Sequence, residues 1–293
     1  MWTRARSRAA AEGGALVSAT STATAPRRLD AIRAIAAKDF TAVRRSKGVV
    51  IPMMVVPFML LVVLPLGVGL AARSAHPPDV STMLRDLPGG LAKPILHLPA
   101  RQRLVTLVDG YLIAPLFLIV PLMLAAVLAA DAFAGEKERK TLESLLHQPV
   151  ADRDLFLAKL LGAFVPAVAI SWIGFACFAV VVDVTAWPVT HHLLVPSKLW
   201  AVVIFWVAPA VAALGLGVMV RVSARATSTQ EANQLGGAVI LPLIFVAVGQ
   251  STGLLLVTLP VAIGIGAVVW LIALWLVVRG ARRFTRDRMS RTI

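Results

Sequence analysis

The side chains that most often perform chemistry are sparse in this sequence and form no catalytic or metal-binding pattern. His191 and His192 are adjacent, so their side chains point in different directions, and neither H-E-x-x-H nor C-x-x-C occurs. A G-x-x-x-x-G-K-[ST] phosphate loop is also missing, because the spacing from Gly89-Gly90 to Lys93 is wrong for one. We therefore expect that the chain is not itself an enzyme and binds no metal or cofactor of its own.

The proportions of hydrophobic and charged residues indicate the broad class to which this protein belongs. Of the 293 residues, 58% are hydrophobic and 15% are charged, and the mean hydropathy is +0.83. Soluble domains average roughly 45–50% apolar and about 25% charged residues, so a soluble chain of this composition could not cover its core. An integral membrane protein is predicted, and a soluble enzyme, a nucleic-acid-binding domain and a disulfide-rich secreted protein are excluded. The single cysteine, Cys177, falls inside an apolar stretch and is interpreted as a packing residue.

Five stretches without Asp, Glu, Lys or Arg mark the membrane-crossing segments: Val49–Ala72, Tyr111–Ala130, Leu160–Val182, Leu199–Val220 and Gly236–Val278. A helix needs about 20 apolar residues to cross the hydrocarbon core, and the last stretch has 43, enough for two helices. Its only polar cluster, Gln250–Gly253, is interpreted as a turn. The predicted fold is an all-α polytopic membrane domain at 49–278 with six transmembrane helices, at about 49–72, 111–130, 160–182, 199–220, 231–249 and 254–278.

The placement of lysine and arginine predicts the orientation. Alternate flanking segments carry 23 of these residues on one side of the membrane and 6 on the other. Cytoplasmic segments carry the excess, so both termini are predicted to be cytoplasmic, in a multi-pass protein of the cytoplasmic membrane. Residues 1–28 have the composition of a disordered tail, and 279–293 form a basic tail. Trp200 is expected at the outer interface and Trp275 near the inner one.

The segment 29–48, before the first span, has apolar residues at steps of three and four, with basic residues between them. This pattern predicts an amphipathic helix in the headgroup layer, which either anchors the topology or contacts a partner. The residues singled out on this connecting helix are Lys38, Asp39, Phe40, Arg44 and Arg45.

The most informative stretch is Asp131–Leu161, which follows the second span. Two pairs of opposite charges stand four residues apart and favour a helix, which ends at Pro149. The helix also carries three leucines although it lies outside the bilayer. A plain solvated connector rarely exposes leucines beside a mixed-charge face, so we interpret this edge as a surface for a partner. The predicted surface consists of Gly135, Glu136, Glu138, Arg139, Thr141, Leu142, Glu143, Leu145 and Leu146.

Two further segments flank the predicted spans. In the second cytoplasmic loop, 221–235, Ser228 and Glu231 have the spacing of a helix capping box. The outer segment 73–110 contains Arg101, Arg103 and Asp109, which we expect on a solvated interfacial face, with contact to a substrate as the alternative. Because no charge-free stretch holds an ionisable group, an ion-coupled transporter, an ATP-independent channel and an intramembrane enzyme are disfavoured alternatives.

Residues 131–161 resemble the loop after the second span in permease subunits of type 2 ABC exporters. The family's G-E-K/R-E-R-G-T-L-E run reads GEKERKTLE here, with Lys140 in place of the usual glycine, and Pro149-Val150 and Lys159-Leu160 follow it. The segment Lys38–Arg45 looks like the family's connecting helix, and 223–232 looks like its second cytoplasmic loop. The resemblance covers most of the chain from about residue 29.

This resemblance implies a six-helix subunit that lies in the lipid bilayer and pairs with a second permease copy, as a homodimer or heterodimer. It also implies a separate ABC ATPase subunit that binds ATP and Mg²⁺, with no nucleic-acid partner. The loop 131–158 would be the coupling element against the ATPase, and 73–110 would form short helices at the outer mouth. The implied function is ATP-driven export across the membrane; a sodium or drug extrusion subunit of the same family is the alternative.

Overall fold

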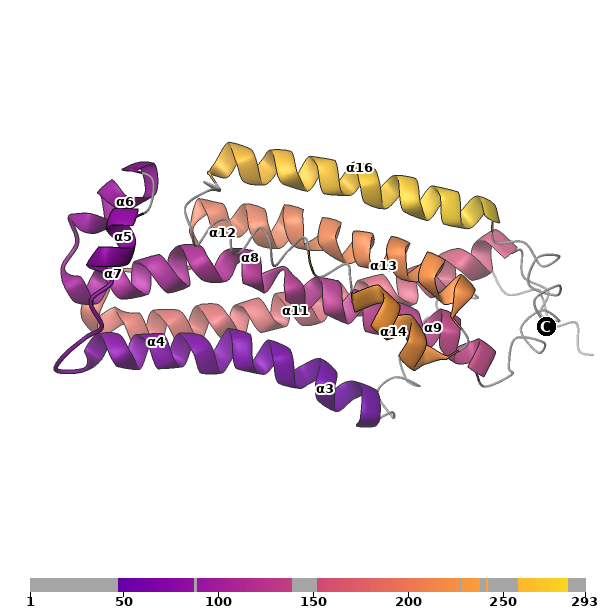
Figure 1. Ribbon diagram of the computed structural model, residues 1–293, viewed down its shortest axis with the longest axis horizontal. Helices are drawn as coiled ribbons and strands as arrows, with labels where there is room; N and C mark the ends of the chain where they lie inside the picture. The colour runs from indigo at the N-terminus through magenta and orange to yellow at the C-terminus, as the bar shows by residue number, and fades with distance from the viewer. Residues whose placement is uncertain are drawn as a thin grey trace, which may run out of the picture.

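The computed structural model describes residues 47–86, 89–138, 152–226, 228–237, 241 and 258–283, and the regular structure within these ranges is helical. The long helices lie side by side in one elongated bundle (Figure 1). Within the described ranges, five helices are long and apolar enough to cross a membrane. They are Met53–Arg73, Ala100–Gly135, Asp154–Thr190, Lys198–Arg225 and Leu259–Ala281.

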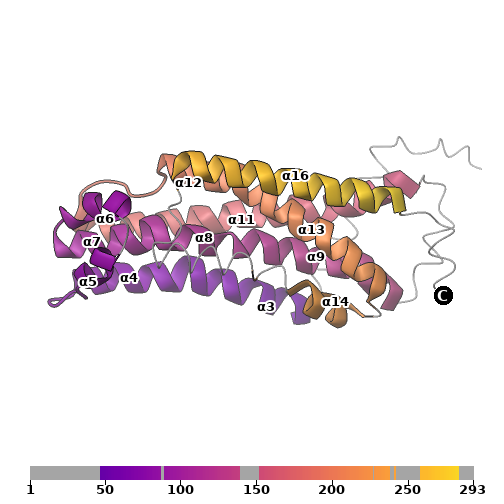
Figure 2. The ribbon, with the colours of Figure 1, turned by 45° about the horizontal axis from the view of Figure 1, so that its top comes forward.

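Most of these helices contain a π-helical turn. The first consists of α3 (Lys47–Phe58), η1 (Met59–Val63) and α4 (Leu64–Arg73). The second consists of α7 (Ala100–Leu107), η2 (Val108–Leu112), α8 (Ile113–Phe117) and α9 (Ile119–Glu138). The third is α11 (Asp152–Thr190), the fourth consists of α12 (Lys198–Val202), η3 (Val203–Val207) and α13 (Ala208–Arg225), and the last is α16 (Leu259–Arg283). The short helices α5 (Ser81–Asp86) and α6 (Gly89–Leu96) lie at one end of the bundle and α14 (Thr229–Gly236) lies toward the other (Figure 2).

The second and fourth long helices form the interior of the bundle. Their most apolar windows are 67% and 72% buried, against 22–28% for the other three long helices. The first, third and last helices therefore surround this pair and expose apolar side chains along their outer faces. Because lipid tails are as apolar as leucine, such faces suit contact with hydrocarbon.

Small residues let α13 approach its neighbours on both sides. A Cβ atom added to Gly215 would lie 2.8 Å from Cδ1 and 3.1 Å from the carbonyl oxygen of Leu122 on α9. A Cβ atom on Gly217 would lie 2.8 Å from Cβ of Leu276 on α16. Close helix contacts of this kind are the main source of packing energy between membrane helices.

Two helices begin well before the spans predicted from the charge-free stretches. The second begins at Ala100 instead of 111, because α7 buries Leu104 and Val105 against neighbouring helices. The third begins at Asp152, eight residues before the charge-free stretch, and runs to Thr190. Lys159, the charge that borders this stretch, is only 2% exposed.

The predicted fifth span, 231–249, falls mainly outside the described residues. Its beginning is described: α14 starts after Ser228, whose Oγ accepts a hydrogen bond of 3.1 Å from the backbone N–H of Glu231. This bond confirms that Ser228 caps the helix, as the spacing predicted. The count of six spans stays a prediction.

Trp200 belongs to the interior and not to the outer interface. Its side chain is fully buried, with ring centroids 4.9 Å from Phe178, 5.4 Å from Phe175 and 5.9 Å from Phe117. The interfacial position predicted for it is therefore wrong. Contacts between aromatic rings contribute free energy in addition to that from burying their surface. The four rings therefore stabilise the packing of α12 against α8 and α11.

We expect the start of α5 to loosen in acid. Asp79 accepts hydrogen bonds of 2.8 Å from the backbone N–H and from the hydroxyl of Ser81, and these bonds lower the pKa of its carboxyl below the usual value. A lowered pKa stabilises the folded turn above the pKa of the unfolded chain, and that contribution disappears as the pH falls through the folded-state value. The protection of the amides of residues 81–86 against hydrogen exchange, relative to the intrinsic rate at each pH, should therefore fall at acid pH, and Asp79→Asn should remove this pH dependence of the protection. An unchanged pH dependence in the variant would contradict the assignment.

Candidate functional site

The end of the bundle opposite α5 and α6 gathers four segments that are far apart in the sequence. The last turns of α9, the first turns of α11, the end of α13 and α14 meet there (Figures 1 and 2). In the predicted orientation this is the cytoplasmic end. The candidate site is built from the side chains that join these four segments.

A carboxylate at the end of α9 binds the start of α14. Oε2 of Glu138 accepts hydrogen bonds from the backbone N–H of Thr229, at 3.0 Å, and from its hydroxyl, at 2.8 Å. The first N–H groups of a helix have no partner within the helix, and a negative charge is favourable at that end. Glu138 therefore acts as a second cap on α14, supplied by a segment 91 residues earlier in the chain.

Gly135 is buried one turn before Glu138, on the side of α9 that faces α14. A Cβ atom there would lie 3.5 Å from Oγ1 of Thr229, an ordinary contact distance, and 3.1 Å from Oδ1 of Asp131 on the same helix. The glycine of the predicted coupling segment therefore lies beside the contact of Glu138 with Thr229.

A buried lysine joins α11 to α9 beside this contact. Nζ of Lys159 donates a hydrogen bond of 2.8 Å to the carbonyl oxygen of Ala132 and lies 5.8 Å from the centre of the Phe133 ring. Phe133 in turn packs against Phe156 of α11, with ring centroids 5.9 Å apart. A buried cation is stable only when it is paired with acceptors, so these contacts hold the first turns of α11 in place. Sequence reasoning placed Lys159 at the border of a span and in the Lys159-Leu160 pair of the family pattern, but it did not reveal this contact with α9.

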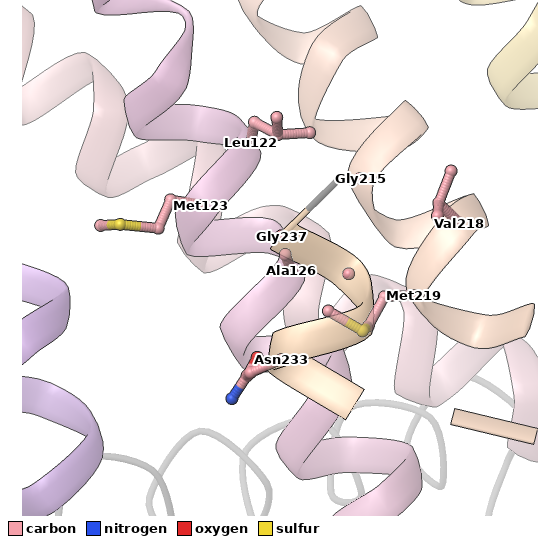
Figure 3. Close-up of a pocket in the computed structure, with 9 residues that line it drawn as sticks. Leu122, Met123, Ala126, Gly215, Val218, Met219, Asn233 and Gly237 are labelled. Carbon is pink, nitrogen blue, oxygen red and sulfur yellow. The ribbon is translucent and has the colours of Figure 1, made fainter. Parts of the chain in front are cut away.

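A small cavity lies between α9, α13 and α14 (Figure 3). Its volume is about 70 Å³, and among its lining residues only Asn233 has a polar side chain. A water molecule occupies roughly 30 Å³ in the liquid, so this cavity is too small for an organic substrate. It marks a looser point of contact between α14 and the two interior helices. The lining residues are Leu122, Met123, Ala126, Gly215, Val218, Met219, Asn233, Gly236 and Gly237.

Asp109, near the other end of the second helix, is a buried carboxylate. It belongs to η2, it is fully buried, and neither oxygen has a hydrogen-bond partner in the described part of the chain. The solvated position predicted for it is wrong, although Arg101 on the same helix is exposed as expected. Asp109 belongs to the helix Ala100–Gly135, which is long and apolar enough to cross a membrane, although the residue precedes the charge-free stretch predicted to span it. Intramembrane acids usually mark functional positions.

The structure describes only part of the predicted coupling surface. Gly135 and Glu138 lie at the junction of α9 and α14, and Glu136 is in the last turns of α9. The other residues of that surface and the connecting helix lie outside the described residues, so their contacts with a partner stay predictions. These residues are Arg139, Thr141, Leu142, Glu143, Leu145 and Leu146, with Lys38, Asp39, Phe40, Arg44 and Arg45.

A bundle of apolar helices with buried charges at the junction of its loops is typical of a multi-pass membrane transport protein. Residues 33–270 match the model of a family described as ABC-2 family transporter protein. This match covers most of the chain, so the chain belongs to the ABC-2 transporter family and is a permease subunit of an ABC transporter. A comparison with curated proteins gives no match.

We expect Glu138 and Thr229 to be coupled in stability. Glu138→Ala removes the acceptor and Thr229→Val removes the hydroxyl, so the double variant should lose about 1 kcal/mol less than the two single losses added together. Thermal unfolding of the four proteins in detergent measures this coupling. Glu138→Ala combined with Ser81→Ala, at the far end of the bundle, serves as the additive control. Full additivity for Glu138 and Thr229 would contradict a direct contact.

Two buried or half-buried aspartates should respond oppositely to the same substitution. Asp109→Leu removes an unpartnered carboxylate and should raise the thermal stability by about 1 kcal/mol, since an apolar side chain has no polar group to satisfy. Asp183→Leu should lower it by a similar amount, because Oδ1 of Asp183 accepts from the N–H groups of Leu194, at 2.9 Å, and Val195, at 3.2 Å. Thermal unfolding in detergent measures both. A loss of stability in Asp109→Leu would mean that its carboxylate has a partner.

Proposed function

We propose that this permease subunit works with a separate ABC ATPase subunit to export a substrate across the cytoplasmic membrane. The observation that carries the proposal is the hydrogen-bonded junction of Glu138 with Thr229. It joins the beginning of the predicted coupling segment to the second loop, at the helices that form the interior of the bundle. Force applied to this segment would therefore reach α9, α13 and α14 together.

In this mechanism the ATPase binds ATP and Mg²⁺, and the permease supplies the path. The segment after Glu138 would contact the ATPase through its leucines, while its charges would set the orientation. Closure of the ATPase would displace the ends of α9 and α11. Because Lys159 binds Ala132 and Phe133 packs on Phe156, these two helices would move as one body.

The direction of export depends on the predicted orientation, in which both termini and the junction of Glu138 with Thr229 are cytoplasmic. The 23-to-6 division of basic residues supports that orientation. A second permease copy would complete the path, since a single chain of this family would form half of it. The short helices α5 and α6 would then lie at the outer mouth.

Copurification tests the proposal. The tagged chain is expressed together with an ATPase that contains a phosphate loop and is encoded beside it, and the complex is extracted in mild detergent. We expect the ATPase to be retained and to hydrolyse ATP after reconstitution into lipid vesicles. Purification of the chain alone from these cells, with no ATPase retained, would contradict the proposed partnership.

A further inference from the structure

Two arginines from different helices share one exposed aromatic ring at the end of the bundle where α9 ends. The guanidinium carbon of Arg221, on α13, lies 4.8 Å from the centre of the Trp275 ring, and that of Arg279, on α16, lies 5.3 Å from it. The Trp275 side chain is 55% exposed, and Arg279 is exposed. Arg225, one turn after Arg221 and also exposed, adds a third cation. We name Arg221, Arg225, Trp275 and Arg279 the arginine–tryptophan patch.

Close packing of α13 on α16 creates the patch. Gly217 leaves room for Leu276, and a Cβ atom on Gly280 would lie 3.4 Å from a methyl carbon of Val220. These small residues bring the last turns of both helices together. The carboxyl ends of helices attract cations, which favours arginine in both turns.

The charges of the patch favour an anion. Arg221 and Arg225 stand four residues apart on one helix, a spacing that places both side chains on the same face. Arg279 is brought within reach of the same ring from α16. Guanidinium groups bind phosphate oxygens in a two-pronged geometry, so side chains gathered in this way suit a phosphate.

The surroundings indicate that the phosphate belongs to a lipid. Trp275 stands in a stripe of exposed apolar residues along α16, with Leu271 69%, Leu274 53% and Val278 49% exposed. Arg279 follows one turn after Trp275, where the apolar stripe ends. An acyl chain along the stripe would place its headgroup beside the arginines, and tryptophan is enriched at this level of the membrane.

We propose that the arginine–tryptophan patch is a binding site for the phosphate group of an anionic phospholipid. The lipid would lie against the last turns of α13 and α16 and hold the two helices together at that end. This site is independent of the ATPase partner and of the transported substrate.

The test compares phosphatidylglycerol with phosphatidylcholine on the full chain. The delipidated protein is titrated with each lipid in detergent, and bound lipid is counted by native mass spectrometry. We expect wild-type protein to prefer phosphatidylglycerol. Arg279→Gln should weaken this preference about fivefold, and Arg221→Gln with Arg279→Gln about twentyfold, since each basic residue near an anionic lipid contributes roughly 1 kcal/mol. Arg221→Lys with Arg279→Lys should keep most of the preference.

The matched control removes two exposed arginines from the other end of the bundle, Arg85→Gln with Arg101→Gln. It should bind both lipids as wild type does. An equal loss of preference in this control, or none in Arg221→Gln with Arg279→Gln, would overturn the proposal. Displacement of the bound lipid by millimolar inorganic phosphate would also overturn it, because the site would then bind free phosphate. Loss of the copurified ATPase with unchanged lipid preference would show that the patch contacts protein instead.

Discussion

Replacing Gly69 by valine is expected to lower the free energy of unfolding by about 3 kcal/mol, because an added Cβ would overlap the side chain of Thr185. Thr185 cannot turn away without loss, since its hydroxyl donates to the carbonyl oxygen of Val181 at 2.7 Å. Separation of α4 from α11 would also break the hydrogen bonds of 2.8 and 2.6 Å from Arg73 to the carbonyl oxygens of Thr185 and Val184. The thermal midpoint in detergent and the yield of monodisperse protein measure the effect.

Gly67, two residues earlier on the same helix, provides the matched control. A Cβ atom added there meets no atom within 4 Å. Gly67→Val should therefore fold with a midpoint near that of wild type. If the two valine variants unfold at the same temperature, α4 does not pack on α11 as described.

The second large effect concerns the predicted coupling surface. Replacing Leu142 and Leu145 together by aspartate should abolish retention of the ATPase, because a few apolar residues carry most of the affinity of a protein interface. Membrane insertion should be unchanged, since neither residue belongs to a predicted span. Copurified ATPase per permease and the rate of ATP hydrolysis in vesicles measure the result.

Met83→Asp is the control for this double variant. Met83 is 37% exposed on α5, at the opposite end of the bundle, so its replacement introduces an acid far from the proposed interface. It should leave ATPase retention unchanged. Full retention in the Leu142 and Leu145 variant would show that the loop is a plain connector.

The sequence was sufficient to predict the apolar helices, because a crossing helix needs a long run of residues without charge. The run 49–72 lies within the continuous helix of α3, η1 and α4, and 199–220 lies within the helix of α12, η3 and α13. The cap at Ser228 was also predictable, since it depends on a contact three residues away. The family resemblance, carried by Gly135–Glu143, agrees with the family match over residues 33–270.

Other features depended on contacts that local spacing does not reveal. Counting charges placed the start of the third span at Leu160, and this local count does not reveal that Lys159 is buried and bonded to Ala132 on another helix. The contact of Glu138 with Thr229 joins residues 91 positions apart. Glutamate and threonine are both common in loops, so their presence does not indicate that these two side chains meet. Trp200 was placed at an interface by its position near a span end, whereas three phenylalanines from neighbouring helices enclose it.

The central claim is that ATP hydrolysed by a partner moves the helices of this chain, and the accessibility of its outer end tests it most directly. A single cysteine at position 85, in a Cys177→Ala background, is exposed to a membrane-impermeant thiol reagent in vesicles that hold the permease–ATPase complex. Its labelling rate is compared without nucleotide and with ATP and vanadate, which traps the closed ATPase. We predict a change of several-fold that disappears in the Leu142 and Leu145 aspartate variant. An identical labelling rate with and without ATP, in a complex that hydrolyses ATP, would contradict the account.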